Sequence, residues 1–89
     1  MQLILHPAAR LELDAALQWS KTAFGDRTAA RLRRRFEQAG QMLIREPALG
    51  AALPLRQFPY TLVYRVQGEV ITVIAVAHQS RQPGYWAKR

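Results

Sequence analysis

The hydrophobic pattern of this sequence changes from helical to strand spacing near residue 50, and that change most limits the folds open to the chain. From Ala8 to about Glu46, apolar residues recur every three or four positions, which is the spacing of amphipathic helices. Later, from Tyr60 to Val66, they alternate with other residues, which is the spacing of a strand with one buried face. Helices followed by strands in a chain of 89 residues indicate one α+β domain, spanning residues 1–89.

The first half of the chain predicts a short strand and then a helix that ends at Gly25. Gln2 to Leu5 form the strand candidate, and Pro7 suits the first turn of the helix, where its missing N–H costs nothing. Glu12 and Asp14 are expected early in this helix, where negative charge suits the positive end of the helix dipole. Two apolar stripes predict a wide buried face, one of Ala8, Leu11, Ala15 and Trp19 and one of Leu13, Leu17 and Phe24.

A second helix is predicted from Arg27 to about Glu46, with Asp26 as its N-cap. Pro47 stops this helix, and Gly50 follows. Two long helices joined by one or two residues must run antiparallel, as an αα-hairpin. The buried stripe of the second helix is expected to be Ala29, Leu32, Phe36, Ala39 and Leu43.

The second half of the chain predicts strands. Ala51 to Gln57 is a strand candidate interrupted by Pro54. Tyr60 to Gln67 and Val70 to Ala77 form a predicted hairpin, with its turn at residues 68 and 69. The predicted order is therefore β-α-α-β-β-β. We expect an α+β fold in which a helical hairpin packs on one face of a small antiparallel sheet, while the other sheet face stays partly open.

The chain is strongly basic, with thirteen Lys and Arg residues against six Asp and Glu, a net charge of +7 and an isoelectric point near 11.1. Such a balance predicts an anionic partner, either a nucleic acid or an acidic protein. Four arginines crowd one turn of the second helix and form either a solvated face or a docking stripe. They are Arg31, Arg33, Arg34 and Arg35. A second polar group forms either a clustered site or scattered surface charges, and it comprises Arg56, Thr61, Arg65, His78, Arg81 and Tyr85.

Several classes of site are not expected. Cysteine is absent, which removes disulfides, thiolate nucleophiles and cysteine metal ligands. His6 and His78 are the only imidazoles, and no glycine-rich phosphate loop is present, so neither a metal nor another cofactor is expected. Ser20 and Ser80 lie in no nucleophile-elbow motif. Without a signal-peptide core or a run long enough to span a bilayer, the protein is expected to be cytoplasmic and to have no membrane contact.

The segment FPYTLVYRVQGEVITVIAVAHQSRQPGYW, from Phe58 to Trp86, resembles the C-terminal signature of the RelE/ParE superfamily of bacterial type II toxins. Upstream, ELDAALQW (Glu12 to Trp19) and the break at Glu46-Pro47…Gly50 match in kind, so the resemblance covers essentially the entire chain. It implies a toxin made beside a cognate antitoxin, whose acidic, amphipathic C-terminal segment wraps and silences it. The candidate antitoxin-binding residues are Arg31, Arg34 and Arg35.

Two activities are known in this superfamily. RelE-like members cut mRNA in the ribosomal A site without a metal, so cationic side chains must stabilise the charged transition state. ParE-like members poison DNA gyrase and perform no chemistry of their own. For a nuclease, the resemblance implies catalytic roles for Arg56, Arg65, His78, Arg81 and Tyr85.

The match to the nucleases fails at Thr61, where they often carry arginine, and the lysine pair near the second strand is also missing. The chain is therefore closer to the ParE-like branch, as a gyrase inhibitor. The candidate target-binding residues are Arg56, Arg65, Arg81, Tyr85 and Trp86. A RelE-like ribosome-dependent mRNA endonuclease and a non-toxic nucleic-acid-binding module are the alternatives, and a monomer and a weak homodimer both stay open.

Overall fold

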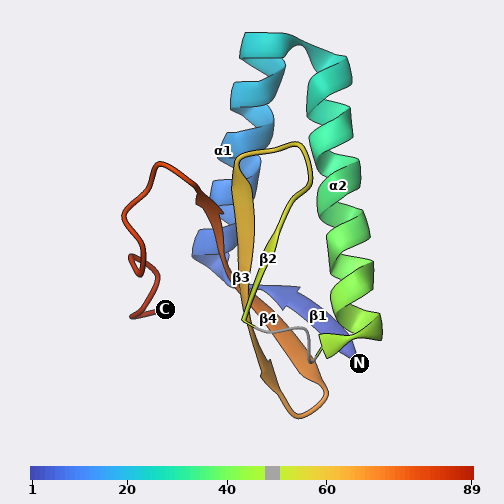
Figure 1. Ribbon diagram of the computed structural model, residues 1–89, viewed down its shortest axis with the longest axis vertical. Coiled ribbons are helices and arrows are strands. Elements are labelled where there is room, and N and C mark those ends of the chain that lie inside the picture. Colours follow the sequence, from blue (N-terminus) through green and yellow to red (C-terminus); the bar gives the residue numbers. More distant parts are fainter. Residues whose placement is uncertain (48–50) are drawn as a thin grey trace.

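The computed structural model describes residues 1–47 and 51–89 and has its elements in the predicted order (Figure 1). They are β1 (Gln2–Leu5), α1 (Pro7–Phe24), α2 (Asp26–Arg45), β2 (Ala52–Pro54), β3 (Tyr60–Gln67) and β4 (Val70–His78). The two helices lie side by side and pack on a four-stranded sheet of order β1-β4-β3-β2. The predicted element order and the helical hairpin over the sheet are confirmed. The α2 helix ends before Pro47, as expected, whereas Gly50 lies outside the described residues.

The sheet is mixed. β2 and β4 both run antiparallel to β3, as predicted, but β1 runs parallel to β4, with Leu3 opposite Ile71. Short connections fix the antiparallel pairs, whereas the chain leaves β1 through the whole helical hairpin, and so long a connection permits either direction. β1 is therefore the edge at which the sheet departs from the antiparallel expectation.

Gly25 separates the two helices. Its φ of 95° and ψ of 175° suit glycine, and its N–H donates to the carbonyl of Lys21. Because α2 begins directly at Asp26, Gly25 takes the N-cap position, and the prediction that Asp26 caps this helix is wrong. At the start of α1, the Nδ1 atom of His6 accepts a hydrogen bond from the N–H of Ala8 at 3.1 Å, a cap that sequence analysis did not anticipate.

The core lies between the hairpin and one face of the sheet. Its largest fully buried side chains are Leu32, Leu43, Leu62, Ile71 and Val73. On α1 only one stripe is buried, because a helix in a two-layer fold turns about a third of its circumference to the core. That stripe is Ala9, Leu13, Ala16, Leu17 and Ser20. The predicted burial of Leu11, Trp19 and Phe24 is therefore wrong, since they are 70%, 57% and 63% exposed.

Candidate functional site

β4 is irregular at Ile74. Its register with β3 runs from Val70 to Val73 and resumes at Ala75, which leaves Ile74 as an extra residue. The extra residue inverts the alternation of the strand. Val73 and Val76 both face the helices, whereas Ala75 belongs to a small cluster apart from this core.

The same point on β4 is where the pairing with β1 stops. β1 ends at Leu5, opposite Val73, and a last hydrogen bond joins the N–H of His6 to the carbonyl of Val73. Within residues 1–47 and 51–89, no strand pairs with this edge of β4 beyond Val73. An unpaired edge leaves backbone donors and acceptors that need other partners.

Glu12 of α1 supplies one of those partners. Its Oε1 accepts the N–H of Val76 at 3.0 Å. Arg89 donates to both carboxylate oxygens, at 2.8 Å from Nη1 and 3.1 Å from Nη2, and the hydroxyl of Tyr85 donates to Oε2 at 2.6 Å. Nη1 of Arg89 also donates to the carbonyl of Ile74 at 3.1 Å. Glu12 and Arg89 together therefore satisfy one backbone group at the irregular residue, the carbonyl of Ile74, and one just after it, the N–H of Val76.

The ion pair is largely withdrawn from water, with side-chain exposures of 19% for Arg89 and 16% for Glu12. Burial by itself raises the pKa of the Glu12 carboxyl, but hydrogen bonds from Arg89, Tyr85 and the N–H of Val76 outweigh it and hold that pKa below its ordinary value. Burial and the hydrogen bond to Glu12 raise the pKa of Tyr85 to about 12. Glu12 is thus ionised and Tyr85 protonated at neutral pH.

The C-terminal segment, residues 79–89, covers part of the sheet face opposite the helices, which was predicted to stay partly open. Tyr85 and Trp86 pack against a cluster of Val63, Ala75 and Ala77. In Figure 1 the segment lies on the same side of the molecule as α1, away from α2. The two aromatic rings meet edge to face, with centroids 5.1 Å apart.

Four of the predicted site residues meet around this segment. The guanidinium of Arg81 lies 4.1 Å from the centroid of the Tyr85 ring. Arg81 also lines a hollow of about 190 Å³ with His78, and it lines a second hollow of about 340 Å³ with His78 and Trp86. His78 stacks edge to face on Tyr60 at 5.1 Å. The structure therefore brings together His78, Arg81, Tyr85 and Trp86.

Arg56 and Arg65, the other two candidate target-binding residues, lie elsewhere. Arg65 stands opposite Thr72, whereas His78 stands opposite Tyr60, and the five positions between Tyr60 and Arg65 span about 17 Å of strand. Arg56 lines a separate groove of about 230 Å³ between α2 and β2. We call this the α2–β2 groove, lined by Arg35, Gln38, Ala39, Met42, Leu53, Pro54, Leu55 and Arg56.

Two arginines of α2, Arg31 and Arg35, face the segment that links β2 to β3. Nη2 of Arg35 donates to Oε1 of Gln57 at 3.0 Å, and the guanidinium of Arg31 lies 5.9 Å from the centroid of the Phe58 ring. Arg34 is exposed. Arg31 and Phe58 also line a groove of about 380 Å³ with the exposed ring of Trp19. Arg31 and Arg35 thus stand beside two neighbouring grooves that have apolar linings.

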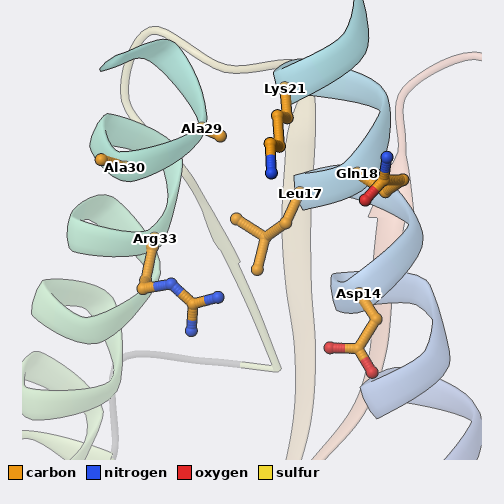
Figure 2. Close-up of a pocket in the computed structure, with 7 residues that line it drawn as sticks. All are labelled: Asp14, Leu17, Gln18, Lys21, Ala29, Ala30 and Arg33. Carbon is orange, nitrogen blue, oxygen red and sulfur yellow. The ribbon is translucent and has the colours of Figure 1, made fainter. Parts of the chain in front are cut away.

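A further groove, of about 410 Å³, lies between the two helices. Figure 2 shows Leu17 reaching into it from α1 and Arg33 from α2, with Asp14 and Lys21 along its rim. In Figure 2, Asp14, Lys21 and Arg33 stand apart from one another along the two helices. Oδ1 of Asp14 lies 4.0 Å from Nε of exposed Arg10. For Arg33 alone among the four arginines of the α2 turn, this groove fits the interpretation of a solvated helix surface.

Glu12 and Arg89 are site residues that the sequence patterns did not predict. Glu12 was assigned to the helix dipole, but it lies beyond the first turn of α1, which begins at Pro7. A carboxylate directly before buried Leu13, at the margin of the apolar stripe, was the available signal. In the described part of the chain, no three His, Asp or Glu residues gather in a metal-binding arrangement, and neither helix is long and apolar enough to cross a membrane.

The comparisons with known proteins agree with the fold and with the predicted family. The fold is similar to that of a chain described as "Chromosomal ParDE TA system from P. aeruginosa", with a TM-score of 0.77, 20% identity, and coverage of 88% of this chain and 95% of that chain. The sequence matches the family described as "ParE toxin of type II toxin-antitoxin system, parDE" over residues 3–83. The chain belongs to this family and is the toxin component of a type II toxin–antitoxin system. No curated protein matches it.

Proposed function

We propose that this toxin inhibits DNA gyrase and that its target-binding surface is the C-terminal segment on β4, with Arg81, Tyr85 and Trp86. Membership of the ParE toxin family supports a binding toxin of this kind. The observation that carries the choice is the hydrogen bond of 2.6 Å from the Tyr85 hydroxyl to Glu12. A phenol whose pKa is raised to about 12 is poorly matched to proton transfer near neutral pH.

The distribution of positive charge also supports binding over RNA cleavage. A metal-free nuclease needs several cations around one phosphate, because charge develops there in the transition state. Arg65 lies about 17 Å along β3 from Tyr60, the residue that pairs with His78. Arg56 lines the α2–β2 groove. With Thr61 in place of a cation, Arg81 is left as the chief positive group beside His78. Docking onto a large enzyme requires no such convergence.

Expression of the toxin in bacteria without its antitoxin tests this proposal. We expect double-strand breaks in the chromosome, because a poisoned gyrase is held with its DNA cleaved. Arg81→Ala should reduce the breaks at equal expression level, and Arg10→Ala, which removes an exposed arginine of α1, should not. Growth arrest with an intact chromosome and with mRNA cut in the ribosomal A site would overturn the proposal. We also infer that the toxin acts in the cytoplasm, where gyrase and the chromosome are found.

We further propose where the cognate antitoxin binds. An acidic, amphipathic segment would place its apolar side chains in the α2–β2 groove, against Met42, Leu53 and Leu55. Its carboxylates would meet Arg35 and Arg56 on the rim, while Arg31 and Arg34 extend the basic surface along α2. β2 is a sheet edge, so an extended part of the antitoxin can add beside it.

Charge reversal tests this antitoxin site. Arg35→Glu should weaken antitoxin binding at least tenfold, because a carboxylate would then face carboxylates. Arg10→Glu gives the same change in net charge on α1, away from the groove, and should leave the affinity within about threefold. Equal losses for the two variants would contradict the assignment, since they would indicate attraction by net charge alone.

A further inference from the structure

Glu12 connects three parts of the fold through one carboxylate. It receives hydrogen bonds from the backbone of β4 at Val76, from the Tyr85 hydroxyl and from both terminal nitrogens of Arg89. Tyr85 and Arg89 are 73 and 77 positions away in the sequence. Because this carboxylate is mostly buried and both its oxygens are hydrogen-bonded, the loss of any one partner should lower the free energy of unfolding.

The C-terminal segment has little else to hold it in place. At its start the N–H of Gln79 donates to the carbonyl of Pro59 at 2.9 Å, but further along its backbone hydrogen bonds are local turns, from the N–H of Tyr85 to Gln82, of Ala87 to Gly84 and of Arg89 to Trp86. Beyond Arg81, its other ties to the domain in the described structure are the contact of Arg89 with the Ile74 carbonyl and the packing of two aromatic rings. Those rings meet the small surface formed by Val63, Ala75 and Ala77. Segments with so few buried contacts open at low free-energy cost.

We propose that Glu12 is a positioning residue of the toxin, which fixes the C-terminal segment on the β4 edge and thereby holds Tyr85, Trp86 and Arg81 in their target-binding arrangement. This inference rests on the proposed function, because it assigns the segment to the target surface. Glu12 itself lies beneath that surface at 16% side-chain exposure and acts through Tyr85 and Arg89. Pre-ordering matters because a segment that orders only on binding loses conformational entropy at that step, which weakens its affinity for the target.

The matched variants are Glu12→Gln and Asp14→Asn, each of which neutralises one carboxylate of α1. The amide of Glu12→Gln keeps the side-chain shape but loses the charge that Arg89 pairs with. We expect NMR relaxation to show fast motion of residues 83–89 in Glu12→Gln, and the indole signal of Trp86 to move toward its position in an unfolded peptide. Asp14 is 61% exposed, so Asp14→Asn should keep the signals of the unsubstituted protein.

The second readout is trapping of gyrase on cleaved plasmid DNA by the same preparations. Glu12→Gln should need at least tenfold more protein for half-maximal trapping, while Asp14→Asn should match the unsubstituted toxin. A segment that stays ordered in Glu12→Gln, or a mobile segment with unchanged trapping, would overturn the inference. If the unsubstituted toxin traps no gyrase, the proposed function fails, and the NMR comparison still decides whether Glu12 holds the segment.

Discussion

Glu12 and Arg89 lie 77 positions apart in the sequence and form a two-point ion pair, with hydrogen bonds of 2.8 and 3.1 Å. The pair joins α1 to the C-terminal segment at the edge of β4, beyond the last residue that β1 covers. A planar guanidinium suits this task, because it meets both carboxylate oxygens and still reaches the carbonyl of Ile74. The target surface that we propose is therefore built on an ion pair.

Arg89→Ala should lower the free energy of unfolding by about 2 kcal/mol, because it leaves a mostly buried carboxylate without its cation. Urea denaturation measures this loss. Arg10→Ala serves as the control, since Arg10 and Asp14 are well exposed and 4.0 Å apart, and it should cost less than about 0.5 kcal/mol. Equal costs for the two variants would mean that the Glu12–Arg89 pair is no stronger than a surface contact.

The stabilising effect of Glu12 should depend on pH. Its pKa in the folded protein is held below the ordinary value of 4.5. The carboxylate therefore contributes its stabilisation above pH 4.5, and this contribution is lost as the pH falls through the lowered pKa. Urea midpoints of the unsubstituted protein and of Glu12→Gln should differ most near neutral pH and converge in acid. A gap that stays constant over this range would contradict the assignment.

Two glycines should respond to alanine in opposite ways. Gly25→Ala should cost about 2 kcal/mol, because φ of 95° with ψ of 175° is a conformation that side chains disfavour. Gly40→Ala should stabilise the protein by about 0.5–1 kcal/mol, since Gly40 lies within α2 and the added methyl would rest 3.7 Å from Leu3 Cδ1. Thermal unfolding of both variants checks the pair, and a loss at Gly40 would show that β1 packs too closely to accept a methyl group.

Alanine variants of one leucine on each helix distinguish the observed core from the core that the sequence predicts. Leu32→Ala should cost about 3 kcal/mol, because Leu32 is 1% exposed in the core. Leu11→Ala should change stability by less than about 0.5 kcal/mol, because Leu11 is 70% exposed. A large loss of stability in Leu11→Ala would instead support the wider buried face that the apolar spacing of α1 predicts.

Periodicity together with the proline and glycine breaks predicted the elements, since both signals are local. The direction of β1 escaped prediction because it depends on a pairing across almost the whole chain. The irregularity at Ile74 could not be predicted either, because β4 is apolar on both faces and its sequence therefore does not show where the alternation inverts. On α1, apolar spacing could not distinguish the stripe that meets the core from the one with Leu11 and Trp19, which stays exposed.

The candidate site was only partly predictable. Arg81, Tyr85 and His78 belong to a polar group that the sequence left open as a clustered site or scattered charges, and these three lie around one segment. The position of Arg65 follows from the strand register, which places it far from His78. The role of Glu12 needed the structure, because its partners Tyr85 and Arg89 are distant in sequence and the place of Glu12 beside the apolar stripe does not identify them.

The most direct test of the account uses one purified preparation in two assays, one with gyrase and supercoiled plasmid and one with ribosomes carrying mRNA. We predict that the toxin traps gyrase on doubly cleaved plasmid and leaves the mRNA intact. Addition of the antitoxin should abolish the trapping. Codon-specific cuts in the ribosomal A site that disappear in the Arg81→Ala, Tyr85→Phe double variant, without any gyrase trapping, would contradict it.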